Sequence, residues 1–300
     1  MDNLLKLLDL SENELKGILD LADVLKAENK KGIKHHRLAG KTLGLIFEKS
    51  STRTRVSFEV GMYQLGGNAL FLSNRDLQIG RGESIPDTAR VLSRYLDGIM
   101  IRTFEQEKVE TLAKYASIPI INGLTDFCHP CQVLADLQTI REYKGSLEGK
   151  KLVYIGDGNN MANSLIVGGL KSGMTVSVAC PKGYEPDKKV LDFAAGKDFT
   201  LTEDIFEAAK DADAIYTDVW ASMGQEAEAE ERKKVFKGYC VSEKLMKAAK
   251  KDCIVLHCLP AHKGEEIEES VFEGHVNEIM DEAENRLHAQ KAVMVKVMEK

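Results

Sequence analysis

Residues 42–67 read TLGLIFEKSSTRTRVSFEVGMYQLGG, and this stretch indicates the fold class. The apolar run over 42–47 is typical of a buried strand. From Ser51 onward, apolar residues recur at helical spacing, and the pair Gly66-Gly67 ends the helix. A buried strand that leads directly into a helix is the repeating unit of a parallel α/β sheet.

The same alternation continues along the chain and predicts an α/β protein of two open parallel-sheet domains. We expect further strands over 98–101, 118–121, 152–155, 175–179, 214–217 and 253–256. A helix near 130–145 would link the domains, and a last helix over about 284–300 would return to the first one. The predicted domains are therefore 1–145 with about 284–300, and 146–283.

Composition and charge exclude several classes of protein. The 300 residues include 41 Lys and Arg against 47 Asp and Glu, which gives a net charge of −6. A mildly acidic chain is a poor candidate for nucleic-acid binding, which needs clustered positive charge. There is no apolar run long enough for a membrane span, and the acidic N-terminal stretch does not resemble a signal peptide. We therefore expect a cytoplasmic protein without a membrane or nucleic-acid partner.

The six cysteines are too few for a disulfide scaffold of this size, so free thiols are expected. Cys128 and Cys131 nevertheless have the C-x-x-C spacing of a redox pair. Together with His257 and Cys258 they would also offer the ligand types of a zinc site. Neither interpretation is supported by a second C-x-x-C or H-x₃₋₅-H element, and we predict no metal.

Polar residues follow the predicted strands at the point where each strand ends. Open α/β sheets bind ligands outside the carboxyl ends of their strands. Six such clusters in two domains predict one site in an interdomain cleft. The clusters are residues 50–55, Arg102, residues 129–132, residues 159–160, Asp218 and residues 257–260.

Residues 51–54, Ser-Thr-Arg-Thr, stand where a helix begins. Hydroxyl groups, free backbone N–H groups and the positive end of the helix together suit a phosphate dianion. Arginine adds a planar fork that holds two oxygens. In the alternative interpretation, Ser51 and Thr52 only cap the helix and the arginines are surface charges. No G-x-x-x-x-G-K-[ST] string is present, which excludes a nucleoside-triphosphate P-loop.

Residues 156–161, Gly-Asp-Gly-Asn-Asn-Met, follow a strand and open a helix, as a dinucleotide-binding turn does. The third glycine is missing, because Met161 takes its place, and the next strand ends in Cys180-Pro181 instead of an acid. A tight turn that points the amide of Asn160 into the cleft is the simpler interpretation. An amide offers donors and an acceptor, which suits an amino-acid head group.

Four strings in this chain resemble those of the aspartate/ornithine carbamoyltransferase family, in the family's order and essentially end to end. They are FEKSSTRTR (47–55), HPCQ (129–132), DVWASMG (218–224) and HCLP (257–260). The last two are similar to the ornithine branch, since the aspartate branch has HPLP in place of HCLP. The resemblance implies transfer of a carbamoyl group from carbamoyl phosphate to the δ-amine of L-ornithine, giving L-citrulline and phosphate.

The resemblance also implies which residues hold each substrate. The donor, carbamoyl phosphate, would bind in domain 1–145 and ornithine in domain 146–283. Ornithine would contact Asn160, Asp218, Ser222 and Met223. Carbamoyl phosphate would contact Ser51, Thr52, Arg53, Thr54, Gln78, Arg102, His129, Pro130, Cys131, Gln132, Cys258, Leu259 and Arg286. The catalytic residues would be Arg102, His129, Asp218 and Cys258.

Two further expectations follow from the resemblance. Gln78 would reach the site of a neighbouring subunit, which implies a homotrimer or a multiple of trimers. No cofactor is expected, because carbamoyl phosphate is already an activated donor. The alternatives that stay open are putrescine, N-acetylornithine or aspartate as acceptor, an inactive binding or regulatory relative, and a nicotinamide-dependent oxidoreductase.

Overall fold

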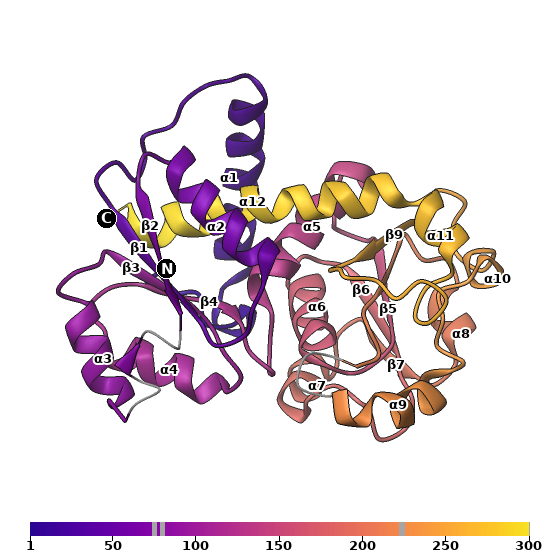
Figure 1. Cartoon of the computed structure of the whole chain (residues 1–300). Helices are drawn as coiled ribbons and strands as arrows, with labels where there is room; N and C mark the ends of the chain where they lie inside the picture. The colour runs from indigo at the N-terminus through magenta and orange to yellow at the C-terminus, as the bar shows by residue number, and fades with distance from the viewer. Residues whose placement is uncertain (74–76, 79–81, 222–225, 300) are drawn as a thin grey trace. The chain divides into compact units, whose positions relative to one another are not determined.

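The computed structural model describes residues 1–73, 77–78, 82–221 and 226–299, and its elements are labelled in Figure 1. The chain divides into two compact units, Met1–Gln138 with Glu284–Lys300, and Thr139–Ala283. Each unit is built on a parallel sheet with helices on both faces. The predicted fold class is therefore confirmed.

The first unit contains a four-stranded sheet of order β2-β1-β3-β4 among its described residues. Its strands are β1 (Thr42–Phe47), β2 (Asn68–Ser73), β3 (Gly98–Arg102) and β4 (Ile120–Leu124). Its helices are α1 (Glu12–Lys30), α2 (Thr52–Gln64), α3 (Ile85–Leu92) and α4 (Gln106–Tyr115), with a 3₁₀ turn η1 (Leu7–Asp9). Helix α5 (Pro130–Lys144) follows β4 and continues into the sequence of the second unit.

Alternating side chains of these strands supply two apolar layers, as a buried parallel sheet requires. Ile46 and Ile99 pack with Ala89 of α3 and Leu112 of α4 in one layer. Figure 1 shows α3 and α4 together on the face of this sheet opposite α1 and α2.

The second unit contains a five-stranded sheet of order β7-β6-β5-β8-β9 in the part that the structure describes. Its strands are β5 (Lys151–Ile155), β6 (Thr175–Ala179), β7 (Phe199–Thr202), β8 (Ala214–Thr217) and β9 (Ile254–His257). Its helices are α6 (Asn160–Lys171), α7 (Lys188–Ala194), α8 (Ile205–Ala209), α9 (Ala229–Phe236), α10 (Glu243–Met246) and α11 (Glu269–Gly274), with the 3₁₀ turn η3 (Glu226–Glu228). Helix α12 (Val276–Met298) begins in this unit and ends in the first.

Several boundaries differ from the sequence prediction. The last helix begins at Val276 and not near residue 284. Strand β4 runs from Ile120 to Leu124, later than the predicted 118–121. Strands β2 and β7 were not predicted at all. Both lie at a sheet edge and leave several side chains exposed. Strand β7 has four residues in which threonine alternates with apolar residues, whereas β2 contains a short apolar run at residues 69–72 that the sequence prediction overlooked.

Both sheets reverse their winding direction at a defined point. In the first sheet β1 lies between β2 and β3, and in the second β5 lies between β6 and β8. Strands that diverge in this way leave a crevice at their carboxyl ends, where α/β proteins bind ligands. At the first switch point, β1 leads into the segment before α2, and β3 ends at Arg102. At the second, β5 leads into the segment before α6, and Asp218 directly follows β8.

Gly158 illustrates how closely the backbone is packed beside the second switch point. A Cβ built on Gly158 would lie 2.3 Å from the backbone carbon of Glu185 and 2.3 Å from the nitrogen of Pro186. Main-chain atoms at that distance have no side-chain rotamer by which to move away. The glycine is therefore required by close approach of two backbone segments.

We predict that Gly158→Ala destabilises the protein by about 1–3 kcal/mol or more, because the backbone must shift to admit the methyl group. Gly238→Ala is the matched control, since a Cβ there would meet nothing within 4 Å. Denaturant unfolding of both variants beside wild type measures the difference. Equal stability of the two variants would contradict the packing argument.

Candidate active site

The N-terminus of α2 is preorganised by its own side chains. Ser51 is the N-cap: its Oγ accepts a hydrogen bond from the Thr54 backbone N–H at 3.2 Å and lies 3.0 Å from Thr54 Oγ1. Thr54 itself is buried. The capping interpretation is thus correct for Ser51, and Arg55 is a surface residue that pairs with Glu59 at 2.9 Å. Capping does not exclude ligand binding, because the helix end keeps its positive dipole.

Arg286 of α12 joins this helix end to α5. Its Nη1 donates to Gln132 Oε1 at 2.6 Å and its Nη2 to Thr54 Oγ1 at 3.2 Å. With the Gln290 amide turned so that its oxygen faces the guanidinium, that oxygen accepts from Nη2 at 2.9 Å and from Nε at 3.1 Å. Arg286 is buried. Three predicted site residues from three separate sequence regions are therefore in direct contact.

His129 lies among positive charges. It is buried just before α5, and its pKa is held well below 6.5 by burial and then by the charges of Arg286, Arg102 and Arg53. The imidazole is therefore neutral at pH 7 and offers an N–H donor without adding charge. Three guanidinium groups close enough to act on one imidazole form a site for an anion with several oxygens.

The C-x-x-C pair does not form a redox centre. Cys128 and Cys131 are free and buried, and burial raises the pKa of each thiol to about 12. Redox chemistry needs the thiolate, which this environment disfavours. Cys131 Sγ instead donates to the Asn122 carbonyl at 3.4 Å, which fixes the start of α5 beside β4. Pro130 is the first residue of that helix, a position where its missing N–H is not needed.

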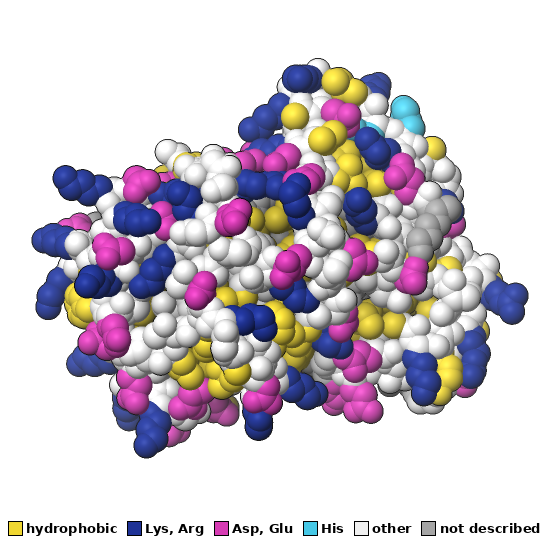
Figure 2. Space-filling view, turned by 180° about the vertical axis from the view of Figure 1, so that it is seen from behind, with side chains coloured by type: hydrophobic (Ala, Val, Ile, Leu, Met, Phe, Trp, Pro, Cys, Tyr) yellow, Lys and Arg dark blue, Asp and Glu magenta, His cyan; other side chains and the backbone are white. Residues whose placement is uncertain are grey.

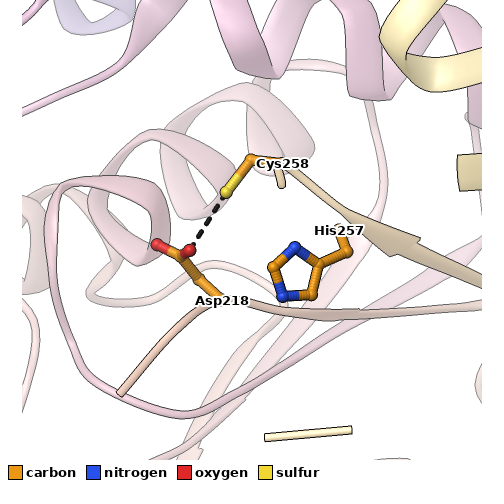
Figure 3. A group of neighbouring side chains, drawn as sticks. All are labelled: Asp218, His257 and Cys258. Atoms are coloured by element: carbon orange, nitrogen blue, oxygen red, sulfur yellow. Dashed lines mark hydrogen bonds between the residues drawn. The ribbon is translucent and has the colours of Figure 1, made fainter. Parts of the chain in front are cut away.

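Asp218 and Cys258 meet in the second unit, as Figure 3 shows. The Cys258 thiol donates to Asp218 Oδ1 at 3.0 Å, and the Val219 backbone N–H donates to the same oxygen at 2.8 Å. Asp218 is buried and Cys258 is partly exposed. This pair can hold an ammonium or amine group by charge and hydrogen bonding.

His257 orients the segment that carries Cys258. Its Nδ1 accepts from the Leu259 backbone N–H at 2.9 Å, so the ring proton is on Nε2, which lies 3.1 Å from Glu266 Oε1. The backbone N–H of His257 donates to Glu282 Oε2 at 2.9 Å. All three side chains are buried. Glu266 and Glu282 were not predicted as site residues, because nothing in a sequence distinguishes a buried acid from its exposed neighbours.

Asp218, His257 and Cys258 have ligand atoms within 4.8 Å of one another, as a metal site would require. The donor set does not fit a cation well. Both ring nitrogens of His257 are already hydrogen-bonded, and Asp218 Oδ1 accepts from two donors. A metal would have to break several of these bonds, so the group is better described as a hydrogen-bonded cluster.

Some predicted residues are not tested by this geometry. Ser222 and Met223 lie outside the described residues. Gln78 is described, and its carbonyl accepts from the Glu83 N–H at 3.1 Å. Asn160 begins α6, and its carbonyl accepts from the Ser164 hydroxyl at 2.8 Å. Among the residues that the structure describes, no helix has the length and apolar character to cross a membrane.

The fold and the arginine-lined site define a class: a protein of two parallel α/β units, one of which holds a preformed anion site. Residues 2–142 match the family model of the carbamoyl-P binding domain of aspartate/ornithine carbamoyltransferases, and residues 148–297 match that of the Asp/Orn binding domain. The chain belongs to the aspartate/ornithine carbamoyltransferase family.

Individual relatives agree with this placement. The chain is 59% identical over 300 residues to an ornithine carbamoyltransferase of Oceanobacillus iheyensis, with coverage of 98% of this chain and 93% of that protein. The structure of the Pyrococcus furiosus ornithine carbamoyltransferase is similar, with a TM-score of 0.94, 56% identity and coverage of 99% and 96%. An acetylornithine transcarbamylase complexed with acetylcitrulline is 31% identical, with a TM-score of 0.88 and coverage of 99% of both chains. These matches favour the tight-turn interpretation of residues 156–161 over the dinucleotide interpretation.

We predict that the imidazole of His129 stays neutral as the pH falls well below about 6.5, the ordinary pKa of histidine. The unfolded state then binds more protons than the folded state, so the contribution of His129 to stability is lost as pH falls through about 6.5 toward the folded pKa. Nitrogen-15 NMR of the histidine rings across that range, with His129→Gln to identify the signal, measures the titration. A midpoint at or above about 6.5 would contradict the prediction.

Proposed function

We propose that this protein transfers the carbamoyl group of carbamoyl phosphate to the δ-amine of L-ornithine, giving L-citrulline and phosphate. The single observation that carries the proposal is the convergence of Arg53, Arg102 and Arg286 on a neutral, buried His129 in a chain of this family. Such a site binds a phosphorylated donor and leaves an uncharged N–H for its carbonyl oxygen.

In the donor half, the α2 N-terminus with Ser51, Thr52, Arg53 and Thr54 binds the phosphate group. Arg102 bridges the phosphate and the carbonyl oxygen, where negative charge develops during attack. His129 donates to that same oxygen. Preorganised donors at such a position are typically worth about 2.7–4 kcal/mol each.

The carbamoyl NH₂ needs acceptors, and Gln132 with the backbone carbonyls of Cys258 and Leu259 would supply them. Gln132 Oε1 accepts from Arg286 Nη1, which fixes the orientation of its amide. The same Arg286 is available to the departing phosphate.

In the acceptor half, Asn160 and the segment with Ser222 and Met223 bind the carboxylate of ornithine, and Asp218 binds its α-ammonium. A free alkyl amine has a pKa of about 10.4 and is mostly protonated at pH 7, so the attacking nitrogen must first lose a proton. The bond between Asp218 and Cys258 places an acceptor and a thiol side by side to select the neutral δ-amine.

Attack forms a bond between the δ-nitrogen and the carbamoyl carbon and gives a tetrahedral intermediate. The bond from that carbon to the phosphate oxygen then breaks, phosphate leaves with the bonding electrons, and the extra proton on the nitrogen passes to the departing phosphate. No redox step or group carrier is involved, because the donor is already activated.

The proposed contacts to a free α-amino acid head group favour ornithine over the other acceptors. The Asp218 carboxylate would bind an α-ammonium, which N-acetylornithine lacks, and the Asn160 amide would bind an α-carboxylate, which putrescine lacks. The string HCLP at 257–260 separates the chain from the aspartate branch. Putrescine, N-acetylornithine and aspartate remain the alternatives that an assay must test.

A homotrimer, or a multiple of trimers, is the assembly that we propose. Val56, Val60 and Tyr63 form an exposed apolar stripe on α2, with Tyr63 81% exposed. The edge strand β2 exposes Leu70 and Phe71. An apolar face of this kind marks a subunit interface, and Gln78 follows it in sequence. The free cysteines suit a reducing compartment, and we propose a cytoplasmic location.

We predict citrulline and phosphate formation with carbamoyl phosphate and ornithine, and little product with putrescine, N-acetylornithine or aspartate. Cys258→Ala should lower kcat by about 10- to 100-fold and weaken ornithine binding, since it removes one bond to a charged group. Product assays over a range of pH and of ornithine concentration measure both effects. An unchanged kcat and pH–rate profile would rule out the role of Cys258, and activity with putrescine alone would overturn the acceptor.

A second prediction tests the shared site. Gln78→Ala and Arg102→Met should each be nearly inactive, while a refolded equal mixture should regain activity at about a quarter of the sites, because some sites then combine an intact Gln78 with an intact Arg102. Sedimentation measures the assembly of each variant. A mixture no more active than its components would contradict the contribution of a neighbour.

A further inference from the structure

Asn159 lies between the helix α6 and the Asp218–Cys258 pair. Its Oδ1 accepts hydrogen bonds from the backbone N–H groups of Met161 at 2.9 Å and Ala162 at 3.3 Å, which makes it the N-cap of α6. The same oxygen accepts from the Tyr154 hydroxyl at 3.3 Å. Three donors therefore surround one atom of the amide.

This environment decides which way the amide points. An oxygen satisfies three donors, whereas an NH₂ group there would face three hydrogens. Asn159 Nδ2 must consequently face the other way, and it donates to Asp218 Oδ2 at 3.0 Å. Asp218 Oδ1 is held by Cys258 and Val219, so both carboxylate oxygens have fixed partners.

We propose that Asn159 is a positioning residue for the acceptor amine: it orients the Asp218 carboxylate so that the other oxygen stays with the Cys258 thiol. The inference rests on the proposed function and adds a residue to it. The turn after β5 thereby couples the cap of α6 to the chemistry at the ends of β8 and β9.

The side-chain type at position 159 separates this role from capping alone. Asp, Asn and Ser cap helices about equally well, but of these only Asn carries an N–H donor on its second atom. Asp204 shows what a cap without that donor does in the same unit. It accepts from Phe206 N at 2.8 Å and Glu207 N at 3.2 Å, and so caps α8 with the same pattern.

An aspartate at position 159 would keep the cap and place a second carboxylate against Asp218. Two carboxylates within hydrogen-bond distance of each other share a proton, which raises the pH at which the pair becomes fully ionised. Among the described residues, the other titratable groups near Asp218 include Tyr154 on β5, Asp157 in the turn after it, and His257 and Cys258 at the end of β9. Asp157 pairs with Arg232, and burial raises its pKa to about 6.

The test compares Asn159→Asp, Asn159→Ser and the matched cap control Asp204→Asn in the full-length protein, with ornithine and carbamoyl phosphate varied separately. For Asn159→Asp we expect kcat to fall about 10- to 100-fold and the acid limb of the kcat–pH profile to move to higher pH. The KM for carbamoyl phosphate should change by less than about twofold, and the melting temperature by only a few degrees, because the cap is kept.

Asn159→Ser should also lower kcat, without moving the acid limb, since it removes the donor and adds no charge. It keeps the proposal testable if Asn159→Asp does not fold. Asp204→Asn should leave kcat and the profile unchanged. The role of Asn159 would be overturned, with the proposed function left intact, if Asn159→Asp kept wild-type activity and an unaltered pH profile. An unaltered kcat in Asn159→Ser would have the same meaning. Absence of citrulline with the wild-type protein would instead overturn the proposed function.

Discussion

The polar cluster of the first unit depends on the hydrogen bonds of the buried Arg286 guanidinium. The guanidinium holds Thr54 at the start of α2 and Gln132 on α5, and its charge contributes to keeping His129 neutral. A buried charge needs full hydrogen bonding to be tolerated, and the planar fork of arginine allows several bonds at fixed angles. Replacing it with lysine would keep the charge but lose that geometry.

The polar clusters of the two units have opposite electrostatic character. The first unit gathers cations around a neutral imidazole, and the second gathers an acid, a thiol and an amide. The chain as a whole has a net charge of −6, and on the face shown in Figure 2 basic and acidic side chains are interspersed. Attraction of the phosphorylated donor is therefore a local property of the arginine cluster and not of the surface at large.

The sequence was sufficient for the architecture and for many of the residues that the structure brings together. Buried strands carry apolar runs, and their carboxyl ends carry Ser51, Arg102, Asp218 and Cys258, so the switch-point rule located them. Edge strand β7 was not predicted because threonines interrupt its apolar pattern, whereas β2 was overlooked although residues 69–72 are apolar. Asn159 was placed in a strand-end cluster but its role was not predicted, and Glu266 was not predicted at all, because an amide or a carboxylate acquires its role from partners distant in sequence.

The division of the chain has a consequence for biosynthesis. Residues 139–283 form one unit, while the other unit is assembled from residues 1–138 and from the last segment that begins at 284. Arg286 belongs to that last segment, so a ribosome must synthesise all of the residues before it, including the whole second unit, before the arginine cluster of the first unit can exist. A nascent chain thus carries an incomplete arginine cluster until this segment is made, and a product truncated before Arg286 would lack the guanidinium that contacts Thr54 and Gln132.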